Sequence, residues 1–292
     1  MQPKNYSYDS PHTKAMLLLQ AHFERMALPI SDYLTDLKSV LDQAIRILQA
    51  MVDVVANKGF LSATLEVMYT MQCVKQARWH DKSHLLWLPR MQEGVVDGVR
   101  FQGKQVESPM ELIYLRRDQL EAIFKAVVPA TAVRELVTVI DSLPKIQITL
   151  NVDSDTPPPA GGRLTIPQGS QFELVVDLKN QAPRPEVCSF HVQSLSVVDL
   201  FLGFPQGSTH IQRRAYTPYF PKPQTESWWL VFADKQRDEL LAMKRVSFGD
   251  RTTTSLTVTA PIQPGEVTFT VHLISDCYMG LDFKAEISLS IV

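Results

Sequence analysis

The chain has 292 residues, of which 45% are hydrophobic and 21% charged, and its 29 basic and 31 acidic side chains give a formal net charge of −2. This length and mixture predict a folded protein with two or three cores and exclude a disordered or fibrous chain. Because the charge is balanced, no global positive field attracts a polyanion, and any contact with nucleic acid must be local.

The cysteines and the first residues indicate a cellular compartment. Cys73, Cys188 and Cys277 lie in three separate stretches without metal-ligand spacing, which favours a reducing environment over a disulfide scaffold. The first ten residues lack the apolar segment of a signal peptide, and no apolar run reaches the length of a membrane span. We therefore expect a soluble, intracellular protein with no membrane contact.

Helical spacing of apolar residues runs through the first 144 residues, which hold eight of the ten methionines. Ser10 and Pro11 predict a helix start, and Pro29 predicts its end. The apolar face of this helix is expected to consist of Met16, Leu19, Phe23 and Met26. Further helices are expected over 35–58, ended by Gly59, and over 62–79, with Leu65, Met68 and Gln72 along one side. Residues 1–88 therefore predict a helical bundle.

The expected helix 35–58 is apolar on most of its circumference, which predicts that neighbouring elements enclose it. Its polar residues nevertheless fall on one narrow stripe formed by Asp42, Gln43, Arg46, Gln49 and Asp53. Periodicity alone leaves two interpretations open. The stripe is either the solvated side of a core helix, or a path on which Arg46 contacts phosphates while Gln43 and Gln49 contact base edges of a single strand.

Shorter elements are expected over residues 89–144. Ser108, Pro109 and Glu111 form a capping-box pattern, Asp118 and Glu121 repeat it, and another helix is expected from about 131 to 141. Compact helices with tight caps predict a helix-loop-helix subdomain. Its turn contains Arg116 and Arg117, which are either solvated side chains or contacts to a nucleic-acid backbone.

From Lys145 onward the apolar residues alternate with polar ones, as in strands. Strands are expected from Ile146 to Leu150 and over 172–178, 190–200, 228–232, 240–246, 254–259, 267–274 and 283–291. Residues 145–292 therefore predict an antiparallel sandwich of immunoglobulin-like or fibronectin-III-like type. The expected fold class is α+β and multi-domain, with a helical bundle, a helix-loop-helix and an all-β sandwich in chain order.

No motif for catalysis or phosphate binding occurs in the sequence: there is no Walker loop, dinucleotide fingerprint, zinc-protease helix or nucleophile elbow. Cys73, His80 and His84 have some metal-ligand spacing, but a surface loop with two histidines is the favoured interpretation. We expect no enzymatic activity, no metal and no cofactor in this chain.

A partner surface is expected in the sandwich. Trp228 and Trp229 alternate along a strand, so one ring should enter the core and the other should face outward, covered by Tyr219 and Phe220. The apolar stretch 198–205 is either a second partner-binding loop or a strand with its turn.

Several long motifs together carry a family resemblance. They are LLLQAHFERMALPISDY, VLDQAIRILQAMVDVVANKGF, the QARW that ends at Trp79, YTPYFPKPQTESWWLVF and LISDCYMGLDFKAEISLSIV. They resemble the Sec-sixty-three domain of large tandem-cassette RNA and DNA helicases, and the resemblance covers nearly the whole chain. Two branches of this family act in the activating signal cointegrator complex and in the spliceosome, and the motifs are more similar to the first.

The resemblance implies a bundle, a helix-loop-helix and an immunoglobulin-like domain downstream of two RecA-like motor domains and a winged helix. It implies that the stripe helix is a ratchet helix whose Arg46 faces the translocating strand, with Gln43 and Gln49 on either side. The implied role is that of a non-catalytic C-terminal module that guides single-stranded RNA or DNA and docks cointegrator or spliceosome subunits. The parent's motor would bind ATP and magnesium and unwind in the 3′ to 5′ direction.

For the parent protein, the resemblance further implies DNA alkylation repair, transcription coactivation and ribosome quality control, in the nucleus and cytoplasm. Two other interpretations stay open. The module is a regulatory and interaction platform without nucleic-acid contact, as in the second cassette of the spliceosomal relative, or it belongs to the related membrane-translocon protein, whose membrane spans and chaperone-partner domain are not found in this sequence.

Overall fold

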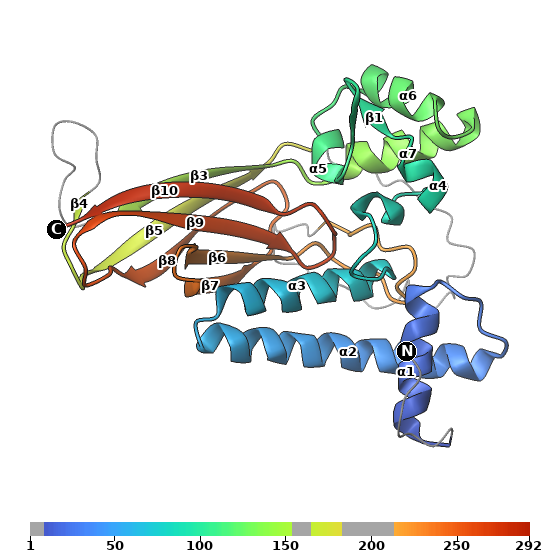
Figure 1. Cartoon of the computed structure of the whole chain (residues 1–292), viewed down its shortest axis with the longest axis horizontal. Coiled ribbons are helices and arrows are strands. Elements are labelled where there is room, and N and C mark those ends of the chain that lie inside the picture. The colour runs from blue at the N-terminus through green and yellow to red at the C-terminus, as the bar shows by residue number, and fades with distance from the viewer. Residues whose placement is uncertain (1–8, 154–164, 183–212) are drawn as a thin grey trace, which may run out of the picture.

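The computed structural model describes residues 9–153, 165–182 and 213–292. Three helices come first in the chain (Figure 1). They are α1 (Pro11–Phe23), α2 (Ser31–Asn57) and α3 (Leu61–Gln76). The capped start of α1 is confirmed, because the Ser10 side chain accepts a hydrogen bond from the His12 N–H. The helix α2 starts four residues before the expected Thr35 and ends at Asn57, and Gly59 follows its cap residue with a φ of 75°.

The expected apolar face of α1 is confirmed for Leu19 and Phe23, which pack against the cluster of Leu18 and Leu41, and is wrong for Met26. Arg25 adopts the left-handed conformation with a φ of 54°, so the helix stops at Phe23 and Met26 lies beyond it with 64% of its surface exposed. The fully buried side chains of α1 are Thr13, Leu18 and His22. The His22 ring lies 2.7 Å from the Val74 carbonyl oxygen of α3, and this hydrogen bond allows a polar ring in an apolar contact.

The helix enclosed by neighbours is α3 rather than α2, which corrects the expectation from composition. Figure 1 shows α3 lying between α2 and the large sheet, with α2 on the outside. Met68, Met71 and every residue from Gln72 to Gln76 are buried in α3, whereas α2 buries only Leu37, Leu41 and Val52. The side chains that α2 buries lie against α1 and α3, whereas Ile47 and Val54 on another face of α2 stay exposed.

Small elements fill the segment between the bundle and the sandwich. They are η1 (His84–Trp87), α4 (Glu93–Val96), the hairpin β1 (Arg100–Phe101) and β2 (Lys104–Gln105), α5 (Pro109–Leu112), α6 (Arg117–Lys125) and α7 (Ala130–Ser142). The first capping box is confirmed, since the Glu111 carboxylate accepts the Ser108 N–H at 3.1 Å. The second begins at Arg116 rather than Asp118, and Gln119 closes it at 3.0 Å.

Strands form the rest of the described chain. They are β3 (Ile146–Asp153), β4 (Thr165–Ile166), β5 (Gln171–Asn180), β6 (Trp228–Asp234), β7 (Glu239–Val246), β8 (Arg251–Thr259), β9 (Gly265–Ser275) and β10 (Phe283–Ile291). One sheet has the order β4-β10-β9-β6-β7 and the other β3-β5-β8, and all pairs are antiparallel except β10 with β4. The mixture of helices and antiparallel sheets confirms the α+β class.

The finer assignment of the sandwich to the immunoglobulin-like type stays a prediction. The expected strand at 190–200, the apolar stretch 198–205 and Cys188 lie outside the described residues. The other seven expected strands all correspond to a strand of the structure, and β4 was not expected.

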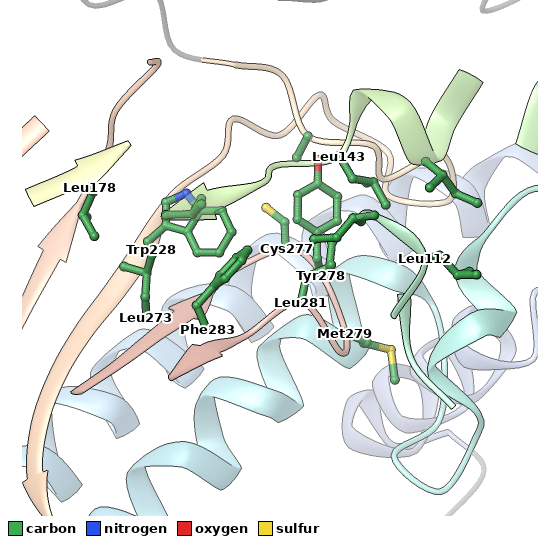
Figure 2. Close-up of a cluster of buried hydrophobic side chains, with 14 of the residues drawn as sticks. Leu112, Leu143, Leu178, Trp228, Leu273, Cys277, Tyr278, Met279, Leu281 and Phe283 are labelled. Carbon is green, nitrogen blue, oxygen red and sulfur yellow. The ribbon is translucent and has the colours of Figure 1, made fainter. Parts of the chain in front are cut away.

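A continuous core joins the sandwich to the small helical elements. Side chains of both sheets, such as Leu174 of β5 and Phe232 of β6, meet between the sheets. The same cluster continues through the loop that connects β9 to β10, residues 276–282, to Leu112 and Leu143 of the helical segment (Figure 2). Figure 2 also shows Tyr278, Met279 and Leu281 of this loop among the clustered side chains.

Polar side chains of α3 attach the bundle to the end of β9 and to the same loop. The Gln72 amide donates to the Ser275 carbonyl at 2.7 Å, and the Gln76 amide donates to the Cys277 carbonyl at 2.7 Å. Between them, the Lys75 ammonium pairs with the Asp276 carboxylate at 3.0 Å, and both side chains are buried. These buried bonds fix α3 against the sandwich, and through α3 they fix the position of α2. Among the described residues, no helix is both long and apolar enough to cross a membrane.

Candidate nucleic-acid interface

The polar stripe lies on the outward side of α2. Gln43 and Arg46 are exposed and Gln49 is half-buried. These residues follow one another at intervals of three, so they lie near one another along the helix surface. The structure therefore brings the three predicted strand-contacting residues together on an accessible surface.

Arg46 is an available cation in this stripe. Across the described ranges, no carboxylate lies within ion-pair distance of its guanidinium. Its neighbour one turn earlier, Asp42, is paired with Lys222 of the segment before β6. This pair neutralises the carboxylate that would otherwise repel a phosphate near Arg46. The arrangement provides a guanidinium fork for a phosphate, flanked by two amides that both donate and accept hydrogen bonds.

An apolar row that the sequence analysis did not identify runs beside the stripe. Ile47, Met51 and Val54 have 58%, 44% and 60% of their surfaces exposed. Their spacing of four and three residues places them on one face of α2. The sequence did show that most of the circumference of this helix is apolar, but this pattern was interpreted as a sign that neighbouring elements enclose the helix.

Arg116 and Arg117 are each matched by a carboxylate. Arg116 at the N-terminal cap of α6 lies 3.2 Å from Asp118, and Arg117 lies 3.5 Å from Glu121 and 3.9 Å from Asp141. All of these side chains are at least 31% exposed, so the pairs are screened by water. A phosphate would have to compete with these carboxylates, and the arrangement favours solvated arginines.

The expected aromatic partner surface is mostly buried. Trp228 and Trp229 are 1% and 5% exposed, so the expectation that one ring faces outward is wrong. The physical reason is that both faces of β6 are covered: Trp228 points into the sandwich core, and Trp229 packs in the cluster that contains Met68 and Met71 of α3. Phe220 is also buried, against α1 and α2, which leaves Tyr219 as the exposed aromatic of the four.

The histidine pair takes part in local contacts. His80 lies 3.1 Å from a Glu66 carboxylate oxygen, and His84 lies 3.1 Å from the Tyr69 hydroxyl. Within the described ranges, no three His, Cys, Asp or Glu side chains gather as metal ligands would. Burial raises the pKa of the Cys73 thiol to about 12, so this thiol stays protonated and is a poor ligand and nucleophile.

The fold and the exposed stripe together define a class of protein, a helical and β-sheet module that presents a long helix whose exposed Arg46 has no ion-pair partner among the described residues. The model of the Sec63 Brl domain matches residues 1–288. The chain belongs to this family, as the sequence motifs indicated.

The curated relatives are much longer proteins. The human protein "Activating signal cointegrator 1 complex subunit 3" is 33% identical over 98% of this chain and 14% of its own length. "DExH-box ATP-dependent RNA helicase DExH14" of Arabidopsis thaliana is 34% identical over 95% of this chain and 11% of its own length. The chain therefore spans about one seventh or less of these relatives.

One solved structure gives a weaker likeness. The CARDB domain of the PF1109 protein from Pyrococcus furiosus covers 52% of this chain at 13% identity with a TM-score of 0.28. We draw no argument from a score of this size.

Proposed function

We propose that this chain is the C-terminal accessory module of an ATP-dependent helicase and that it guides a single strand of RNA or DNA along α2. The observation that carries the proposal is Arg46, an exposed guanidinium without an ion-pair partner among the described residues, between Gln43 and Gln49. In this arrangement, Arg46 binds a phosphate, and the two amides contact sugar or base edges without reading a fixed sequence.

The motor lies outside this chain in the proposal. Relatives with this domain are several times longer and are named as helicases or as a cointegrator-complex subunit. The sequence itself contains no phosphate-binding loop. We therefore place ATP and magnesium in upstream RecA-like domains, whereas this chain holds the strand between motor steps and hydrolyses nothing.

The apolar row on α2 is proposed to contact the other domains of the same polypeptide. Ile47, Met51 and Val54 lie beside the stripe, so a domain seated on them would form the second wall of a strand channel. The RecA-like and winged-helix domains implied by the family are the proposed occupants. Subunits of a cointegrator complex or a spliceosome are proposed as further partners elsewhere on the module, in the nucleus and cytoplasm.

A second candidate function is a regulatory platform with no nucleic-acid contact. The observation that favours it is the charge: the chain has a net charge of −2, and Arg116 and Arg117 are matched by carboxylates. Under this alternative the stripe contacts protein rather than a strand.

Affinity for single strands separates the two functions. Binding of a fluorescent 20-nucleotide single-stranded RNA or DNA would be measured by anisotropy at low salt for the unmodified chain, Arg46→Glu and the matched control Arg117→Glu. The proposal predicts that Arg46→Glu weakens binding about fivefold or more and lowers the slope of log K against log salt by about 0.7. The control should change affinity much less, because Arg117 is already paired with carboxylates. Equal affinity of Arg46→Glu and the unmodified chain would reject the strand path.

A further inference from the structure

A second group of cations lies at the C-terminal end of α3. Arg25 reaches there from the end of α1 and donates to the Gln76 carbonyl at 2.9 Å and the Ala77 carbonyl at 3.2 Å. Arg78 donates twice to the Leu86 carbonyl, at 2.9 and 3.1 Å, and Arg25 also donates to this oxygen at 3.4 Å. The two guanidiniums therefore meet at one carbonyl oxygen.

These two guanidiniums have no carboxylate partner among the described residues. Burial and the charge of Arg78 lower the pKa of Arg25 to about 10, and burial lowers the pKa of Arg78. Two carboxylates, those of Glu24 and Glu93, attract the Arg78 charge, but neither bonds it. Glu24 accepts from the Trp79 indole N–H at 2.6 Å, and Glu93 accepts from Lys82 at 2.5 Å. The carbonyls at the end of α3 and the charges of Glu24 and Glu93 nearby offset part of the two positive charges, and an anion bound directly to the guanidiniums would stabilise the pair further.

Both side chains keep donors available for an anion. A guanidinium has five N–H groups, and the backbone carbonyls take three from Arg25 and two from Arg78. A guanidinium donates to a tetrahedral phosphate in a more fixed geometry than an ammonium does. The chemistry of the pair therefore favours a phosphate group.

An aromatic ring lies against this pair. The Arg25 guanidinium carbon is 3.6 Å from the centroid of the Tyr219 ring, and 48% of Tyr219 is exposed. A ring that is covered on one side by a guanidinium and open to water elsewhere offers a stacking surface for a nucleobase. Phosphate forks beside an exposed aromatic ring are the combination that single-strand binding sites use.

The segment that carries Tyr219 connects the pair to the stripe on α2. Phe220 anchors this segment in the cluster that contains Leu37 and Leu41 of α2. Two residues later, Lys222 pairs with Asp42, which lies one helical turn from Arg46. Tyr219 and Lys222 thus lie on one short segment between the two candidate phosphate contacts.

We propose that Arg25, Arg78 and Tyr219 form a second contact for the same single strand, in which one phosphate accepts hydrogen bonds from both guanidiniums and an adjacent base stacks on Tyr219. This inference rests on the proposed function, because the strand reaches the pair by passing Arg46 and Lys222 along α2.

The test compares oligonucleotides with and without bases. A 20-nucleotide single-stranded DNA and an abasic deoxyribose-phosphate strand of the same length are titrated into the chain and into Tyr219→Leu. Stacking predicts about fivefold or greater weakening for the strand with bases and no change for the abasic strand. Arg78→Gln should lower the slope of log K against log salt by about 0.7 for both strands. Arg116→Gln, at an exposed guanidinium paired with Asp118, is the matched control and should change neither.

Because the Arg78 side chain also bonds the Leu86 carbonyl of η1, its variant is used only if its urea midpoint shows that it is folded, and Arg78→Lys provides a milder replacement that keeps the charge but loses the fork. If Arg46→Glu weakens binding while Tyr219→Leu and Arg78→Gln do not, the second contact is wrong and the proposed function stands. If all three bind like the unmodified chain, both fail. If a serine-phosphorylated peptide is bound and released by Arg78→Gln while DNA binding is unchanged, the pair recognises a protein and this inference is overturned.

Discussion

The Asp276 carboxylate is the buried charge that holds α3, and through it α2, against the sandwich. One of its oxygens accepts from Lys75 at 3.0 Å and from Arg245 at 2.9 Å. The side chains of Lys75 and Asp276 are 4% and 2% exposed. In Asp276→Asn the shape is kept but the Lys75 ammonium is left buried without an ionised partner, and breaking a buried pair in this way costs about 3–5 kcal/mol of unfolding free energy.

The two cations, Lys75 and Arg245, differ in burial, so the variants at this site should differ in their cost in unfolding free energy. The Arg245 side chain is 42% exposed and can turn toward water. In Lys75→Met the carboxylate keeps Arg245, so the expected cost is the loss of one charge-assisted hydrogen bond, about 1.5–3 kcal/mol. The double variant Lys75→Met/Asp276→Asn should cost less than the sum, because no buried ammonium remains to be stranded.

Urea unfolding followed by tryptophan fluorescence measures these differences, since Trp229 packs in the same α3–sheet contact. The matched control is Lys125→Gln, which removes an exposed pair with Glu121 at 3.2 Å and should cost about 0.5 kcal/mol or less. If Asp276→Asn lowers the free energy of unfolding no more than this control does, the buried pair does not hold the bundle to the sandwich.

Two other predictions concern the same region. Burial raises the pKa of Glu226 to about 7 from its usual 4.5, so the folded state binds this proton more tightly, and the stability it contributes is lost as pH rises through 7. Relative to Glu226→Gln, the unmodified chain should therefore lose up to about 3 kcal/mol of unfolding free energy between pH 5 and pH 8 in urea titrations, and a pH-independent difference would contradict the burial argument. At Gly280, φ is 73° and an added Cβ would lie 2.9–3.0 Å from the His84 ring, whereas at Gly169, φ is 64° and nothing lies within 4 Å. Gly280→Ala should thus cost about 1–3 kcal/mol more than Gly169→Ala, with part recovered in His84→Ala/Gly280→Ala, and equal losses would show that the His84 contact does not matter.

The sequence predicted the helices and strands more accurately than it predicted which of their faces are buried. Alternation and capping patterns located α2, α3, α7 and seven strands within a few residues, because these signals are local, but they missed η1, α4 and the early end of α1. Burial of Gln72, Lys75 and Gln76 could not be predicted, since their partners lie about 200 residues away in the loop before β10. A polar residue on a helix is read as exposed unless such a distant partner is known.

The lack of information on distant partners also explains the two wrong predictions of burial, for the tryptophan pair and for α2. Strand alternation predicted one exposed tryptophan, but α3 covers the outer face of the large sheet and buries Trp229. An apolar circumference predicted that α2 is enclosed, but the row of Ile47, Met51 and Val54 is open. In both cases the periodicity was interpreted correctly, but the sequence does not show which element packs against each face, and this decides burial.

Part of the candidate site was found from sequence. The spacing of Gln43, Arg46 and Gln49 predicted one stripe, and the structure places Gln43 and Arg46 exposed on the outward side of α2 with Gln49 half-buried. The Arg25 and Arg78 pair was not found, because its members follow two different helices and meet only at the Leu86 carbonyl of η1. No motif within one stretch of sequence indicates that these two side chains lie close together in the fold.

The central claim is that the outward side of α2 carries a single strand, and crosslinking tests it most directly. A single-stranded RNA containing 4-thiouridine would be bound to the chain at low salt, irradiated and mapped by mass spectrometry. The account predicts that the main crosslinked peptide contains α2 residues between Gln43 and Met51, and that Arg46→Glu reduces its yield. Crosslinks confined to other parts of the chain, with none on α2, would contradict it.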